Sequence, residues 1–130
     1  MKFWQTSLII NLLMINAATA TTHHPEEFLS KIHGTKDEGR QIVQHFCATC
    51  HAKKPLIALG APRINNKTDW EPRIAQGLAK LLAHTAEGYG AMPARGGCFE
   101  CSDEQLQLAI LAMLPVSLKN KLNNELKENK

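Results

Sequence analysis

Five consecutive residues carry most of the chemistry that this chain can perform. Cys47, Cys50 and His51 form a C-x-x-C-H run, which is the pattern of a covalent c-type haem attachment site. Cysteines three positions apart lie on one side of a helical turn. Their sulfurs can then form thioethers with the two vinyl groups on one porphyrin edge, and His51 is placed to ligate the iron from the proximal face. The run therefore predicts one covalent haem c.

Two other interpretations of the cysteines stay open at this point. A C-x-x-C pair can be a thioredoxin-like redox site, or half of a zinc site completed by Cys98 and Cys101. Neither explains why a histidine follows Cys50 directly, so we favour haem. Cys98 and Cys101 are also spaced C-x-x-C, but Ser102 follows them, which argues against a second haem. In an oxidising compartment we expect these two to form a disulfide, and a redox-active pair is the alternative.

An iron held by His51 has a second axial position, for which Met92 is our candidate. Met92 lies in a glycine-rich loop, which can bring backbone close to a porphyrin face. Met113 belongs to an apolar helical stripe and is expected to be a core residue. His45 and His84 are the rival ligands; His45 should point elsewhere, and we interpret His84 as a solvated helix residue. A thioether ligand raises the reduction potential and closes the iron to outside ligands, which suits electron transfer.

The first twenty residues have the features of an export signal. Lys2 supplies a basic start, residues 8–15 are mainly apolar, and residues 18–20 have the small-x-small pattern of a signal-peptidase site. The apolar run is short for a membrane span, although an uncleaved anchor is the alternative. We expect residues 1–20 to be a cleaved signal peptide and the protein to be periplasmic, where haem attachment and disulfides both occur.

The spacing of apolar residues, with glycines and prolines between the apolar runs, predicts an all-α fold of about four short helices around the haem. A first helix is expected over residues 37–50. Its Gly39 leaves room for another helix to cross closely, and the alternative is that a glycine so near the helix end has no packing role. Asp69 is expected to cap a second helix, with Pro72 in its first turn. A third runs from Leu78 to about residue 86.

The last helix has the clearest boundaries in the sequence. Ser102 and Gln105 form a potential capping box at its start, and Pro115 ends it. Apolar residues recur at helical spacing between these limits and predict a buried stripe, which consists of Leu106, Ala109, Ile110 and Met113.

Together these segments resemble the cytochrome c5 family of monohaem class I cytochromes. The resemblance covers about residues 36–113 and includes the haem motif, the run 60–63, the run 70–77 and the methionine loop with its cysteine pair. Residues 53–57 form a longer and less glycine-rich stretch than the family usually has. The resemblance implies the class I cytochrome c fold.

The resemblance also implies roles for individual residues. By it, Met92 is the distal ligand and Cys98 is bonded to Cys101. Pro62 matches the position whose carbonyl accepts a hydrogen bond from the axial histidine ring. Such a bond would orient His51 and raise its basicity.

The same patterns predict the domain boundaries. Residues 21–36 are interpreted as a loose polar N-terminal extension and residues 37–115 as the cytochrome c domain. Residues 116–130 are a charged C-terminal tail, which we expect to be frayed. The alternative is a short amphipathic helix that docks on the domain, because three leucines recur every four residues, at Leu118, Leu122 and Leu126.

The favoured function is an exported electron carrier rather than an enzyme, in which one haem c cycles between Fe(III) and Fe(II). Family analogy implies transient docking to redox partners such as a respiratory complex or a terminal oxidase. A monomer or weak dimer is expected, with membrane association only through partners. The formal charge of +3 comes without a basic stripe, so nucleic acid is not a predicted partner. An enzyme or gas sensor with an open sixth iron position is the alternative.

Three basic residues are candidates for steering the docking. Arg95, Lys53 and Lys54 are expected near the exposed haem edge, and ordinary solvated charge is the competing interpretation.

Overall fold

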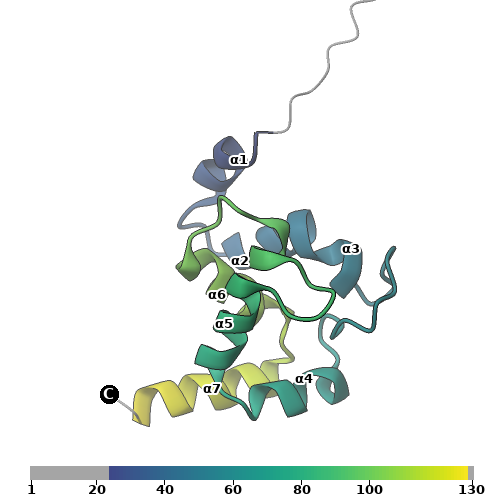
Figure 1. Ribbon diagram of the computed structural model, residues 1–130. Coiled ribbons are helices and arrows are strands. Elements are labelled where there is room, and N and C mark those ends of the chain that lie inside the picture. Colours follow the sequence, from purple (N-terminus) through teal and green to yellow (C-terminus); the bar gives the residue numbers. More distant parts are fainter. Residues whose placement is uncertain (1–23, 129–130) are drawn as a thin grey trace, which may run out of the picture.

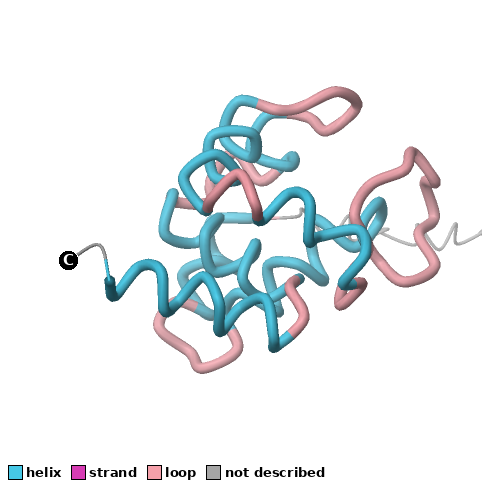
Figure 2. Tube along the Cα trace, turned by 90° about the horizontal axis from the view of Figure 1, so that it is seen from below, coloured by secondary structure: helices cyan, strands magenta, loops and turns pink. Residues whose placement is uncertain are grey.

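The computed structural model describes residues 24–128, so the predicted signal segment 1–20 lies outside the described part. Helices make up most of this part (Figure 1), and loops and turns connect them (Figure 2). Residues 24–128 contain no β-strand. The prediction of an all-α architecture is therefore confirmed. The four expected helices are present, and two further helices, one at each end, pack against them. Within the described range, none of the helices is both long enough and apolar enough to cross a membrane.

The predicted first helix is one helical stretch with a wider turn inside it. It consists of α2 (Glu38–Ile42), the π-helical segment η1 (Val43–Cys47) and α3 (Ala48–His51). The apolar periodicity predicted this stretch, but it did not predict the π-helical turn, which shifts the register of the side chains that follow.

α2 packs across α6 (Asp103–Met113), the last helix of the predicted domain. The two backbones meet at Gly39, where an added β-carbon would lie 2.6 Å from the carbonyl carbon of Leu108. No real β-carbon fits at that distance, so the prediction that Gly39 permits a close crossing is confirmed.

The second helix, α4 (Lys67–Ile74), begins earlier than predicted. Its cap is Asn66, whose side chain accepts a hydrogen bond from the backbone of Asp69 at 3.2 Å. The prediction that Asp69 caps the helix is wrong, because Asn66 has the extended backbone and the side-chain oxygen that a cap requires. Asp69 instead lies in the first turn and binds the guanidinium of Arg63 at 2.9 Å.

The third and last helices are close to their predicted limits. Gly77, with a φ of 84°, separates α4 from α5 (Leu78–Glu87). The capping box of α6 is confirmed, because Gln105 and Ser102 bond each other's backbone N–H groups at 2.9 and 3.2 Å. The predicted stripe is also confirmed, since all of its members are buried: Leu106, Ala109, Ile110 and Met113.

The interpretation of residues 21–36 as a loose extension is wrong for most of its described part. Residues Pro25–Ile32 form helix α1, with Leu29 and Ile32 buried in the core. Phe28 on the same helix stacks against His45, with ring centroids 4.2 Å apart. Because polar residues separate these apolar positions, the sequence analysis did not recognise an amphipathic helix here. Such a short helix becomes stable only when its apolar face packs on the domain.

The expectation of a frayed C-terminal tail is also wrong. Residues Val116–Glu128 form helix α7, which contacts α4, and Figure 1 shows α7 beside α4 along the bottom of the molecule. Leu118 and Leu122 are buried, as expected from the alternative prediction of an amphipathic helix that docks on the domain. The side chain of Leu126 lies outside the described residues.

Candidate haem site

A cavity of about 790 Å³ lies among the helices, and its walls contain all the predicted haem residues. Cys47, Cys50 and His51 come from the η1–α3 stretch, Pro62 from the following loop and Met92 from the loop after α5. Many of the other lining side chains are apolar, and α6 contributes four of them: Leu106, Ala109, Ile110 and Met113. The volume is in the range of small-molecule and cofactor sites.

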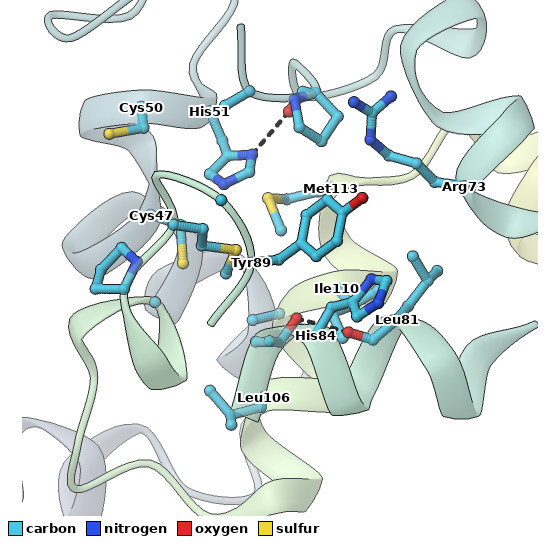
Figure 3. A pocket seen from close by; sticks show the side chains of 18 of the residues that line it. Cys47, Cys50, His51, Arg73, Leu81, His84, Tyr89, Leu106, Ile110 and Met113 are labelled. Carbon is cyan, nitrogen blue, oxygen red and sulfur yellow. Dashed lines mark hydrogen bonds between the residues drawn. The ribbon is translucent and has the colours of Figure 1, made fainter. Parts of the chain in front are cut away.

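His51 is buried and held in one orientation. Its Nδ1 lies 2.8 Å from the carbonyl oxygen of Pro62 (Figure 3), and its own carbonyl accepts from the backbone N–H of Ile64 at 2.7 Å. Since a carbonyl can only accept, Nδ1 carries the proton. The lone pair of the ring is then on Nε2, which is the tautomer that a metal requires.

Trp70 supports this arrangement, and the sequence analysis did not assign it such a role. The indole Nε1 donates to the carbonyl of Arg63 at 2.9 Å, one residue after the carbonyl that holds His51. The indole is buried and roughly parallel to the imidazole of His51, with ring centroids 6.4 Å apart. A buried tryptophan needs a hydrogen-bond partner for its N–H. The presence of a tryptophan close to the haem motif was therefore the sequence signal that could have indicated such a supporting contact.

The two cysteines of the motif are free thiols on the same helical stretch as His51 (Figure 3). Burial raises the pKa of Cys47 to about 11, and the neighbouring Cys50 adds to the shift. The Cys47 thiol is therefore protonated at neutral pH. A thioredoxin-like pair works through a thiol of lowered pKa, so this environment argues against that alternative.

The Met92 loop closes on itself next to the cavity. Tyr89 and Met92 exchange backbone hydrogen bonds of 3.0 and 3.1 Å. Gly88 has a φ of 88°, and a β-carbon there would lie 2.9 Å from the Met92 carbonyl oxygen. Only glycine fits this conformation and this contact, so Gly88 fixes the path by which the loop reaches the cavity.

Cys98 and Cys101 form a disulfide with a Cα–Cα distance of 5.4 Å, and both are buried. The guanidinium of Arg95 bonds the carbonyl of Cys101 and, at 3.1 Å, the carboxylate of Asp103. Arg95 is thus paired internally rather than free at the surface. With Cys98 and Cys101 bonded to each other, their thiols cannot complete a zinc site, and no cluster of potential metal-binding side chains occurs within residues 24–128.

The rival histidines differ in position. His45 stacks on Phe28 and is not among the residues that line the cavity. His84 does line the cavity and stacks on Tyr89, with ring centroids 4.2 Å apart (Figure 3). Our interpretation of His84 as a solvated helix residue is therefore wrong, because α5 turns that face towards the cavity.

Comparison with known proteins agrees with this geometry. Residues 34–111 match the family described as "Cytochrome C oxidase, cbb3-type, subunit III". Cytochrome c-555 of Chlorobaculum tepidum is 38% identical over 80 residues, which cover 58% of this chain and 71% of that protein. Cytochrome c5 of Azotobacter vinelandii is 35% identical over 79 residues, 59% of this chain and 92% of the relative. The chain belongs to the cytochrome c5-like family of monohaem class I cytochromes.

A solved structure supports the same assignment of fold. This cytochrome resembles a chain from a crystal structure of an electron transfer complex of nitrite reductase with cytochrome c. The TM-score is 0.53 at 30% identity, over 65% of this chain and 94% of the other. The class I cytochrome c fold is thereby confirmed. The protein is a monohaem electron carrier rather than an enzyme, and its cofactor is one covalent haem c.

The cavity of this cytochrome fits such a group. It offers two thiols and an imidazole with an available Nε2 on one stretch, a thioether on another, and an apolar lining between them. The buried Nε of Arg95, whose residue lines the same cavity, has no hydrogen-bond partner among the described residues. An orphaned donor on a cavity wall is expected where a bound group belongs.

Proposed function

We propose that Cys47 and Cys50 hold the haem through thioethers and that His51 and Met92 are the axial ligands of its iron. When bound, haem c supplies an iron that accepts and releases single electrons. The observation that carries the proposal is the 2.8 Å contact between His51 Nδ1 and the Pro62 carbonyl. It reserves Nε2 for a metal at the wall of a cavity that Met92 also lines.

The chain's own residues have separate tasks in this proposal. The cysteines on η1 and α3 keep the porphyrin in the protein in both redox states. The apolar lining excludes water from the iron, and the Met92 thioether favours the ferrous state and denies the sixth position to small ligands. A carrier needs both properties, because it must release an electron to a partner without reacting with oxygen.

Optical spectra of the protein, matured with a c-haem export system, test the ligands. We expect the pyridine haem assay to give a c-type spectrum and the oxidised protein to have the sulfur-to-iron charge-transfer band. The band should vanish in Met92→Leu and persist in Met113→Leu, a matched control whose methionine also lines the cavity. Persistence of the band in Met92→Leu would overturn the Met92 assignment, and rapid CO binding by the reduced wild type would favour an open-site sensor.

We further propose that the carrier works in the periplasm, delivered by residues 1–20, and exchanges electrons with respiratory partners through brief docking. The relatives named above are cytochromes c-555 and c5, and the similar structure comes from an electron transfer complex with nitrite reductase. Mass spectrometry of the exported holoprotein tests the first part: cleavage after Ala20 should leave Thr21 as the first residue. A mass that retains the first twenty residues would indicate an anchor instead.

A further inference from the structure

The segment between Met92 and α6 contains an arginine in a strained backbone conformation. Residues Ala94–Gly97 form the short 3₁₀-helical turn η2, in which Arg95 has a φ of 57°. This left-handed region is unfavourable for a residue that carries a β-carbon. The next two residues also have positive φ angles, and both are glycine. An arginine at a position whose backbone suits glycine indicates that contacts of its side chain offset the strain.

The Arg95 side chain joins this turn to the start of α6. Its Nη2 donates to the carbonyl of Cys101 and lies 3.1 Å from the carboxylate of Asp103, which begins α6. These contacts span six and eight residues of the chain. The backbone bonds of the turn are local by comparison, such as the 3.0 Å bond from the Gly96 N–H to the Pro93 carbonyl. The guanidinium therefore holds the turn against the next helix.

The bond to the Cys101 carbonyl is the more protected of the two contacts. Cys101 is 2% exposed, and the side chain of Arg95 is 26% exposed. The side chain of Asp103 is 66% exposed. An exposed ion pair contributes little to stability, whereas a buried carbonyl that loses its partner is unfavourable. We therefore expect the carbonyl bond to hold the turn and the ion pair to add little.

The side chain of Met92 rests against the same turn. An added β-carbon at Gly96 would lie 3.3 Å from Cε of Met92, so the methyl group of the methionine packs on the backbone of residue 96. Arg95 and Met92 also both line the haem cavity. A movement of the turn away from α6 would therefore remove the support of the Met92 thioether.

We propose that Arg95 is a positioning residue, which keeps the Met92 loop closed over the haem site by binding the Cys101 carbonyl. The proposal rests on the role of Met92 as an axial ligand and adds the residue that holds this ligand in place. The disulfide fixes the acceptor, because it ties Cys101 to Cys98. The effect is greatest in the oxidised protein, since a thioether favours ferric iron less than ferrous iron.

Imidazole binding to the oxidised holoprotein measures how often the loop opens. Imidazole reaches the iron only after Met92 has left it, so its apparent affinity is proportional to the population of the open loop. R95M keeps an apolar stem but removes the charge and every donor. We expect R95M to bind imidazole about tenfold more tightly than the wild type does.

The matched control for R95M is R40M. Arg40 is an exposed arginine that pairs with Asp37 at 3.2 Å outside the cavity, and its loss changes the net charge equally. R40M should bind imidazole within about twofold of the wild-type affinity. An unchanged affinity in R95M, or an equal increase in R40M, would overturn the proposal. If R95M does not mature, R95K is measured instead. Lysine lacks the planar fork of arginine, so we expect an increase of about threefold, and an unchanged affinity would count against the proposal.

D103N separates the carbonyl bond from the ion pair. It removes the carboxylate charge and leaves the Cys101 carbonyl in place. Because the Asp103 side chain is mostly exposed, D103N should bind imidazole within about twofold of the wild-type affinity. An increase as large as that of R95M would show that the ion pair holds the loop, which would overturn the assignment to the Cys101 carbonyl.

A variant that only weakens the fold provides the last comparison. L122A truncates a buried leucine of α7 that does not line the cavity. Its imidazole affinity should stay within about twofold of the wild type, because distant sites act independently. An increase equal to that of R95M would show that general destabilisation opens the loop and would overturn the positioning role.

The sulfur-to-iron charge-transfer band distinguishes this proposal from the proposed function. A wild-type protein without the band would contradict Met92 as a ligand and would overturn both. A wild-type protein with the band, together with an R95M variant of unchanged imidazole affinity, would remove the role of Arg95 alone.

Discussion

Gly39 of α2 lies directly against the backbone of Leu108 in α6. A β-carbon at position 39 would be 2.6 Å from the Leu108 carbonyl carbon, so the two helices cross with no side chain between them. This crossing joins α2, which leads into the stretch that carries Cys47, Cys50 and His51, to α6, which lines part of the cavity. The packing of α2 on α6 therefore requires that residue 39 has no side chain.

Gly39→Ala should destabilise the folded holoprotein by about 1–3 kcal/mol, because the added methyl forces the two backbones apart. The measurement is the midpoint of chemical denaturation followed at the Soret band. Gly34→Ala is a control in which the added β-carbon meets no atom within 4 Å, although its φ of 74° is itself unfavourable. A midpoint for Gly39→Ala equal to the wild type would contradict the close crossing.

The Glu38 carboxylate predicts a pH dependence of stability. It is buried at the junction of α2 and α6. Burial raises the pKa of Glu38, but hydrogen bonds from Gln105 at 2.9 Å and the backbone of Gly34 at 2.8 Å, together with His33, outweigh this effect and hold the pKa below its ordinary value. In the unfolded chain these contacts are absent, so the carboxyl there binds a proton more readily.

A lowered folded pKa means that the Glu38 contribution is present above the unfolded pKa, near the ordinary value of 4.5. It is lost as the pH falls through the lower folded pKa. Glu38→Gln should therefore lose more stability at pH 7 than at pH 3, both relative to wild type. Unfolding free energies measured across this range provide the check. Parallel curves for the two proteins would contradict the assignment.

Trp70→Phe tests the link between α4 and the loop that holds His51. Phenylalanine keeps most of the apolar packing but cannot donate to the Arg63 carbonyl. The Arg63 carbonyl still accepts from the backbone N–H of Asn66 at 3.1 Å, so loss of the indole bond should cost about 0.5–1.5 kcal/mol. The loosened loop should also broaden the resonances of the His51 ring in the NMR spectrum of the reduced protein. Unchanged stability and unchanged His51 resonances would show that the indole bond does not support the histidine.

Leu122→Ala tests whether α7 is part of the folded domain. Leu122 is 1% exposed, and truncation of a buried leucine costs about 2–5 kcal/mol. The matched control is Val116→Ala in the same helix, at an exposed position that should change stability little. In Leu122→Ala the midpoint temperature of thermal unfolding should decrease equally whether it is followed at the haem or by far-ultraviolet circular dichroism. A loss of helix signal without any shift of the haem transition would mean that α7 unfolds independently.

The sequence determined the chemistry because covalent attachment depends on local spacing. Cys47, Cys50 and His51 are close in the chain, so one helical turn suffices to present them together. The same holds for the capping box of Ser102 and Gln105, whose groups are three residues apart. Glycine at position 39 also indicated a close crossing, since few other reasons favour glycine inside a helix.

Only the tertiary structure decided the contacts between distant segments. α1 and α7 have polar sequences with a few apolar positions, and they are stable as helices because the domain supplies partners for Leu29 and Leu122. The bond between Trp70 and Arg63 and the cavity position of His84 depend on how whole helices are oriented. Local spacing determines which side chains are neighbours within one helical turn. Packing between segments that are distant in the chain determines which helix faces meet. For this reason the sequence alone did not reveal these contacts.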